Sequence, residues 1–191
     1  MIVRPGPYYY RRHGGGVGVW LVAGVALLLA PYLAPASSPA APPGQRAAVP
    51  SGRALAANPR ITTTRAHGCD PARDLRSPRL DPRVREVLAG AARAYPIRVS
   101  CLRTGHSYYV RGTRRVSNHT AWRAVDLDMV AGRPVGPGNT AARDLAWRIG
   151  RLRGHLAPAE VGSPWTFGGG GPWFTDAGHQ GHIHVGYGRA R

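Results

Sequence analysis

The stretch GHQGHIHVGY, residues 178–187, places three histidines in a segment whose second half has the pattern of a buried strand. Successive side chains of a strand point to opposite faces. In HIHVGY one face therefore carries His182, His184 and Gly186, and the other carries Ile183, Val185 and Tyr187. We expect a strand with one face in the core and imidazoles on the other.

A second segment has the same two-sided character. AVDLDMV, residues 124–130, alternates apolar residues with Asp126 and Asp128. If this strand neighbours the first, Asp126 and His184 share a surface, and His119 in the preceding loop can fold back over it. Two histidines and a carboxylate are a common zinc ligand set that leaves a fourth position for water. Zinc in that state supplies hydrolytic chemistry.

The spacing of these residues carries a resemblance. Ser117, His119 and Asp126 form S-x-H-x-x-x-x-x-x-D, and His182 and His184 form H-x-H late in the chain. This order resembles the zinc D-Ala-D-Ala carboxypeptidases and related peptidases of the LAS type, whose metal geometry also occurs in the Hedgehog signalling domain. With His179 added, the ending is similar to that of the penicillin-insensitive murein endopeptidases.

The resemblance covers roughly residues 81–188 and implies a Hedgehog/DD-peptidase-like fold. It implies His119, Asp126 and His184 as the Zn²⁺ ligands. His182 would lie beside the metal, to stabilise developing charge or carry a proton. Arg103 matches the family arginine that binds a substrate carboxylate or carbonyl, for which a guanidinium fork is suited. Ser117 of the same motif is expected on the substrate-binding side.

The chain departs from the family pattern at two positions. Trp122 stands where the pattern has glycine. Gly181 stands where many of these peptidases place a Glu or Asp that takes the proton from the attacking water, which glycine cannot do. His179 and Asp176 are the two candidates to replace that base. If neither reaches the water, the domain binds zinc without efficient hydrolysis.

Three further polar residues are not expected to bind the metal directly. Asp128 is expected to be solvated or to orient a metal ligand through a hydrogen bond. His106 and His155 are expected at ordinary polar positions.

Helix and strand signals are mixed without a regular β-α-β repeat. Asp81 and Pro82 start a helix that ends before Pro96, and Asn139 caps a second helix. A strand is expected at residues 97–102 and another near Glu160. This pattern predicts an α+β fold, with a small mixed or antiparallel sheet and flanking helices.

The N-terminal part has the features of a targeting segment. Residues 1–16 are basic, and residues 17–36 contain no charge. The second stretch is long enough to span a bilayer, but Ala34 and Ala36 also form a cleavage pattern. A single-pass anchor in the bacterial plasma membrane and a cleaved signal peptide both remain open. In either case the rest of the chain is extracytoplasmic.

A Pro- and Ala-rich flexible linker is expected over residues 37–65, followed by a zinc peptidase-like domain over residues 66–191. Cys69 and Cys101 are the only cysteines. Outside the cytoplasm they are expected to form a disulfide.

Arginine dominates the charge of the chain. There are 26 basic and nine acidic residues, with no lysine. A basic surface favours an anionic polymer such as the bacterial wall. No helix-turn-helix or zinc-finger spacing is present, so nucleic acid is not an expected partner. We expect an exported, monomeric zinc hydrolase that cleaves amide bonds in peptidoglycan peptides. The alternative is a catalytically weak, zinc-containing wall-binding domain.

Overall fold

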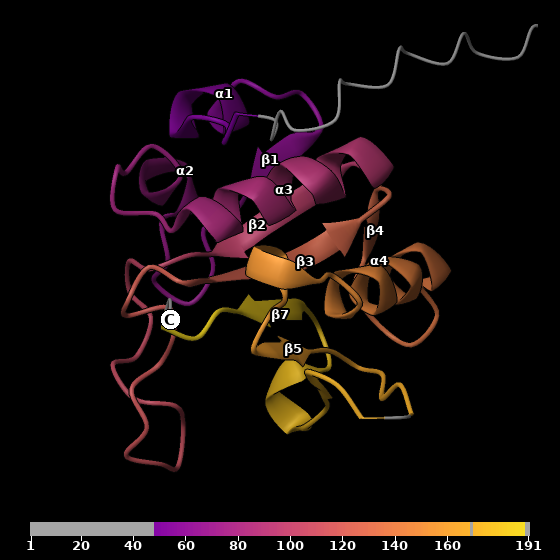
Figure 1. Cartoon of the computed structure of the whole chain (residues 1–191). Coiled ribbons are helices and arrows are strands. Elements are labelled where there is room, and N and C mark those ends of the chain that lie inside the picture. Colours follow the sequence, from indigo (N-terminus) through magenta and orange to yellow (C-terminus); the bar gives the residue numbers. More distant parts are fainter. Residues whose placement is uncertain (1–47, 169, 190–191) are drawn as a thin grey trace, which may run out of the picture. The chain divides into compact units, whose positions relative to one another are not determined.

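The computed structural model describes residues 48–168 and 170–189 (Figure 1). The predicted basic segment 1–16, the predicted apolar segment 17–36 and the first part of the predicted linker lie outside these ranges. Within them, no helix combines the length and the apolarity needed to cross a bilayer.

A mixed sheet of seven strands forms the centre of the fold. Its order is β1-β2-β3-β7-β5-β6, with the short β4 paired to β3. β1 and β2 are parallel, as are β5 and β6, and the remaining pairs are antiparallel. The α+β class and the mixed sheet predicted from the sequence are therefore confirmed. The strands are β1 (Ile61–Thr63), β2 (Ile97–Cys101), β3 (Ala124–Val130), β4 (Arg133–Pro134), β5 (Glu160–Gly162), β6 (Trp173–Phe174) and β7 (Ile183–Gly186).

Two longer helices lie against the sheet (Figure 1). Their buried apolar residues share one core with those of the strands. Asp81 caps α3 (Pro82–Ala94) by accepting a hydrogen bond from the Arg83 backbone N–H at 2.9 Å. Asn139 caps α4 (Thr140–Gly150) in the same way, through the N–H of Ala142 at 3.0 Å. Both caps are as predicted. The shorter helices are α1 (Gly52–Ala56), α2 (Pro71–Asp74) and the 3-10 helices η1 (Gly154–Leu156) and η2 (Ala177–His179).

The folded domain begins earlier than predicted. Residues 48–65 were assigned to the linker, but α1 and β1 lie in this stretch, and β1 pairs with β2. Leu55 and Ile61 are buried and hold the two elements on the core. The boundary predicted at residue 66 was therefore wrong. The sequence did not indicate these elements, because two isolated apolar residues in a Pro- and Ala-rich stretch make no periodic pattern.

Candidate metal centre

Strand register brings the first two predicted ligands together. β3 and β7 are antiparallel neighbours in which Asp126 pairs with His184 and Val125 pairs with Val185. Because side chains alternate along a strand, the two valines enter the core and the two polar side chains share the other face. The alternation predicted for residues 125–127 and 182–187 thus matches the structure. At the end of β3 it breaks, because Val130 is buried in the core and Met129 is only half-buried.

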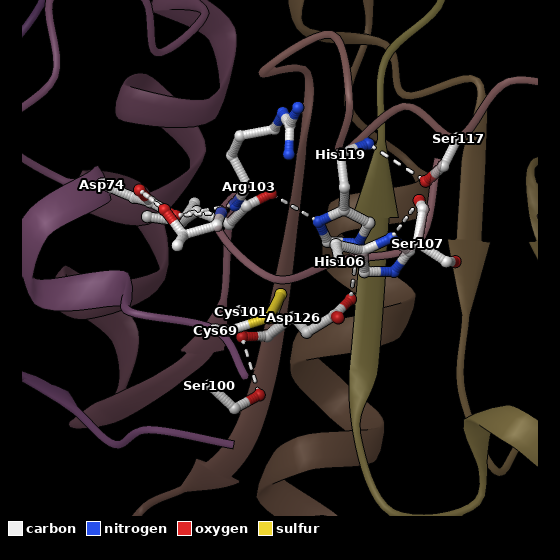
Figure 2. The surroundings of a disulfide bond; sticks show 12 residues. Cys69, Asp74, Ser100, Cys101, Arg103, His106, Ser107, Ser117, His119 and Asp126 are labelled. Carbon is white, nitrogen blue, oxygen red and sulfur yellow. Dashed lines mark hydrogen bonds and ion pairs between the residues drawn. A yellow bond between two sulfur atoms is a disulfide. The ribbon is translucent and has the colours of Figure 1, made fainter. Parts of the chain in front are cut away.

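His119 reaches the same point from the loop before β3. Its backbone lies in a tight turn, in which the N–H of Thr120 donates to the carbonyl of Ser117 at 3.1 Å. The His119 side chain is only 1 % exposed. Figure 2 shows His119 and Asp126 turned toward each other, close to the disulfide.

The three side chains meet at one point. Asp126 Oδ1 lies 3.2 Å from His119 Nε2 and 2.9 Å from His184 Nδ1. The two ring nitrogens are 3.1 Å apart. In a tetrahedral zinc site with bonds of about 2.0–2.1 Å, neighbouring ligand atoms lie about 3.3 Å apart. The spacing of the three atoms is therefore close to that of three corners of such a site.

Hydrogen bonds at the far side of each imidazole select the nitrogen that faces this point. The Leu102 carbonyl lies 2.6 Å from His119 Nδ1 and can only accept, so Nδ1 donates and Nε2 is free. For His184, Nε2 lies 3.2 Å from Glu160 Oε1, which leaves Nδ1 toward Asp126. A carboxylate or carbonyl behind a histidine is the usual way to orient a metal ligand.

The electrostatics of the site favour positive charge. The hydrogen bond with His184 lowers the pKa of Glu160 to about 2 despite partial burial. Burial alone would raise the pKa of Asp126, but contacts with His119 and His184 hold it well below its usual value. Burial opposes the charging of His184, yet the hydrogen bonds to Asp126 and Glu160 raise its pKa to about 9. Two carboxylates thus attract a cation to this point.

Cys101 lies next to the same cluster. Cys101, His119 and Asp126 form a buried group that could hold a metal ion, with candidate ligand atoms within 4.8 Å of one another. Cys101 is, however, bonded to Cys69, which confirms the predicted disulfide. A disulfide sulfur is not the thiolate that binds metals. His184 is therefore the better third ligand, since its Nδ1 lies close to both of the others.

The residues predicted as catalytic gather beside the ligands. His179 Nδ1 lies 2.7 Å from Asp176 Oδ1, and its ring centroid lies 5.5 Å from that of His184. His182 Nε2 is 3.7 Å from Asp126 Oδ1, and burial lowers its pKa and so favours the neutral imidazole. A Cβ added to Gly162 of β5 would lie 2.5 Å from the His179 ring, so this glycine leaves room for the imidazole.

The two predicted substrate-binding residues have different positions. Arg103 is half-buried, and its Nε donates to the Thr120 carbonyl at 3.1 Å, beside His119. Ser117 is only 3 % exposed, and its Oγ accepts from the His119 backbone N–H at 3.3 Å. This buried hydroxyl shapes the His119 turn, and a substrate-binding role for Ser117 stays a prediction.

Sequence reasoning missed Glu160 as part of the site. Glu160 pairs with Gly186 across β5 and β7. Its carboxylate is held by Asn118 Nδ2 at 2.7 Å and by Arg115 Nη1 at 3.1 Å. A lone acid at the start of a short strand belongs to no motif. The one indication is that Glu160 and Gly162, two residues apart on β5, lie on the same face of the strand.

Two other expectations need correction. Asp128 accepts two hydrogen bonds from Arg98, both at 2.9 Å, so it neither is left to solvent nor orients a metal ligand. His106 stacks on His119 with ring centroids 4.0 Å apart, so it covers one face of this candidate metal ligand. His155 pairs with Glu86 away from the site, as its assignment as an ordinary polar residue suggested.

No protein-family model, curated protein or solved structure matches this chain.

Proposed function

We propose that this protein is a zinc-dependent hydrolase of amide bonds in peptidoglycan peptides. The observation that carries the proposal is the convergence of His119, Asp126 and His184 from three separate segments onto one point. All three of their mutual distances are 3.2 Å or less. The same three residues are the ligands implied by the resemblance to LAS-type peptidases. A Hedgehog/DD-peptidase-like fold is proposed on that resemblance.

The donor set fits zinc. Two imidazole nitrogens and one carboxylate oxygen leave one open position, which is typical of catalytic rather than structural zinc sites. Bound there, zinc makes a water molecule acidic near neutral pH and polarises a carbonyl group. The protein's part is to orient the ligands, through the Leu102 carbonyl behind His119 and Glu160 behind His184.

His179 is the proposed general base in place of the acid absent at Gly181. Asp176 accepts from the His179 ring at Nδ1, which leaves Nε2 free to take a proton. An imidazole oriented by a carboxylate is a common arrangement for this task. His182 would share the proton transfer or stabilise developing charge, and Arg103 would bind a substrate carboxylate.

A catalytically weak wall-binding domain is the second candidate. It is favoured by the open space around Gly181, where an added Cβ would meet nothing within 4 Å. The family pattern has a carboxylate here. Under this alternative the metal site is intact, but peptidoglycan is bound without being cut.

We further propose that the domain acts outside the cytoplasm, either tethered by residues 17–36 or secreted. Peptidoglycan is the proposed partner, and the monomer is the proposed active form. The unpaired peptide carboxylates of the wall suit a chain with net charge +17.

The decisive experiment measures metal content and wall digestion together. Wild type is expected to hold zinc at one ion per chain and to release peptides or amino acids from purified peptidoglycan. Asp126→Asn should lose both properties. Asp128→Asn is the matched control, because it lies on the same strand but contacts Arg98. Asp126→Asn protein that retains stoichiometric zinc would refute the metal centre. If zinc-loaded wild type binds peptidoglycan but releases nothing, the hydrolase proposal is rejected and the wall-binding alternative is supported.

A further inference from the structure

A cavity of about 650 Å³ lies beside the candidate metal centre and is unusually basic. Four arginines line it: Arg73, Arg76, Arg79 and Arg103. Asp74 is the only acidic residue in its wall. That carboxylate accepts hydrogen bonds from the backbone N–H groups of Arg103 at 2.9 Å and Thr104 at 2.7 Å, and Figure 2 shows it turned toward Arg103. Asp74 therefore holds the loop together and pairs with none of the four guanidinium groups.

No other acidic side chain of the chain neutralises this cavity. All nine acidic residues lie in the part that the structure describes. Five pair with arginines outside the cavity: Asp70, Asp81, Asp128, Asp144 and Glu160. The other three bond to histidines: Glu86, Asp126 and Asp176. The positive charge of the cavity is thus left for a ligand.

Trp122 forms an aromatic part of the wall at some cost to the backbone. Its φ of 61° lies in the left-handed region, which glycine adopts much more easily. This is the position at which the resembling peptidases have glycine. The Arg79 guanidinium lies 5.7 Å from the centre of the Trp122 ring. A strained residue points to a role for its side chain, and here that side chain holds a cavity arginine by a cation–π contact.

The cavity and the metal centre share one loop. Thr120 lines the cavity directly after the proposed ligand His119, and its carbonyl accepts from Arg103 Nε at 3.1 Å. On the other side, the Leu102 carbonyl next to Arg103 accepts from His119. The cavity wall is thus connected to the proposed ligand His119 through residues 102–103 and 119–120.

We propose that this cavity binds free carboxylates of an acidic peptide substrate, and that Arg73, Arg76 and Arg79 select peptides with two or more such groups. Guanidinium groups bind carboxylates through paired, charge-assisted hydrogen bonds. Arg103 binds the carboxyl or carbonyl group nearest the metal, and the other three arginines bind an acidic group further along the substrate peptide. This assignment of substrate class rests on the proposed peptide hydrolysis.

The test compares two short stem-type peptides, one with two free carboxylates and one with both converted to carboxamides. Binding to the full chain is measured by calorimetry at fixed ionic strength, in a His179→Ala background that keeps the peptide intact. The diacid is expected to bind at least about tenfold more tightly. The triple variant Arg73→Gln, Arg76→Gln, Arg79→Gln should lose this preference. If the triple variant does not fold, Arg79→Gln alone should reduce it.

The control is a second triple variant with the same loss of charge. Arg93, Arg133 and Arg153 are exposed and lie outside the cavity wall, so their replacement by Gln should leave the preference intact. An equal loss in both triple variants would assign the effect to net charge and overturn the proposal. Equal binding of the two peptides by the parent protein would do the same. Inorganic tripolyphosphate that binds more tightly than the diacid, in an Arg79-dependent manner, would reassign the cavity to phosphate polymers.

Failure of the cavity assignment can be told apart from failure of the proposed hydrolysis. A protein that prefers the diacid but releases nothing from peptidoglycan loses the hydrolysis and keeps the cavity assignment. A protein that cleaves diacid and carboxamide peptides equally well, with or without the three arginines, loses the cavity assignment alone.

Discussion

Glu160 reaches His184 through the space that Gly186 leaves open. Glu160 pairs with Gly186 across β5 and β7, and a Cβ added to Gly186 would lie 2.5 Å from Glu160 Oε1. The same carboxylate oxygen lies 3.2 Å from His184 Nε2. A residue without a side chain thus lets an acid on one strand orient an imidazole on the next.

Glu160→Gln should weaken zinc binding by about 10- to 100-fold, because the amide no longer accepts strongly from the His184 ring. Gly186→Ala should act in the same direction by pushing the carboxylate away. Competition with a chromogenic chelator measures both. Asp144→Asn is the control, since Asp144 pairs with Arg148 on α4. Unchanged zinc affinity in Glu160→Gln would show that His184 needs no such partner.

Gly181→Glu tests whether the missing acid limits catalysis. The position is open, with nothing within 4 Å of an added Cβ. The variant should therefore fold with a free energy of unfolding within about 0.5 kcal/mol of wild type. Added to His179→Ala, it should restore part of the hydrolysis lost in that variant, measured as product release from peptidoglycan. If His179→Ala loses no activity to begin with, His179 is not the base.

The disulfide between Cys69 and Cys101 should make a large contribution to stability. The cysteines are 32 residues apart, and closing a loop of that length stabilises a fold by about 3–4 kcal/mol in the chain-entropy model. The double variant Cys69→Ser, Cys101→Ser should lose about this much in denaturant unfolding. Adding reductant should lower the stability of wild type and leave that of the double variant unchanged. If reductant lowered the stability of both proteins equally, the loss would not come from the disulfide, and the prediction would be wrong.

Acid should weaken the start of α3 through Asp81. Burial opposes ionisation of this carboxyl, but the hydrogen bonds from Arg83 outweigh it and lower its pKa below 3.8. Since the folded-state pKa is the lower one, the ionised group stabilises the fold above about pH 5, and this contribution is lost as the pH falls through the folded-state pKa. Asp81→Asn should therefore flatten the fall in unfolding free energy below about pH 4, measured by denaturant titration at a series of pH values.

Asp81→Ala separates charge from capping. It removes the acceptor for the Arg83 backbone N–H as well, and it should cost about a further 1 kcal/mol at neutral pH. Equal stability of the Asn and Ala variants at pH 7 would contradict a capping role.

Local patterns were enough to predict the parts of the site that lie on regular strands. Alternation at residues 125–127 and 182–187 indicated which side chains leave the core, and β3 and β7 do pair as neighbours. The helix caps at Asp81 and Asn139 were equally local. The disulfide followed from the expected compartment and the cysteine count.

The missed features depend on the pairing of distant strands. Glu160 joins the site only because β5 lies next to β7, and no spacing in the sequence reports that neighbour. Asp128, expected to be solvated or to orient a metal ligand, instead accepts hydrogen bonds from Arg98 on β2. His106 stacks on His119 because of the path of an irregular loop, and such a loop has no periodic sequence pattern from which the contact could be predicted.

One covalent bond ties together the two halves of the proposed substrate path. Cys69 precedes the helix that carries Arg73, while Cys101 pairs with Asp126 in the sheet and leads into Arg103. The disulfide therefore limits how far the arginine-lined cavity can move from the proposed metal centre. If the proposed hydrolysis holds, a fixed separation selects substrates by length, and moving the acidic group one residue nearer to or farther from the cleaved bond should weaken binding.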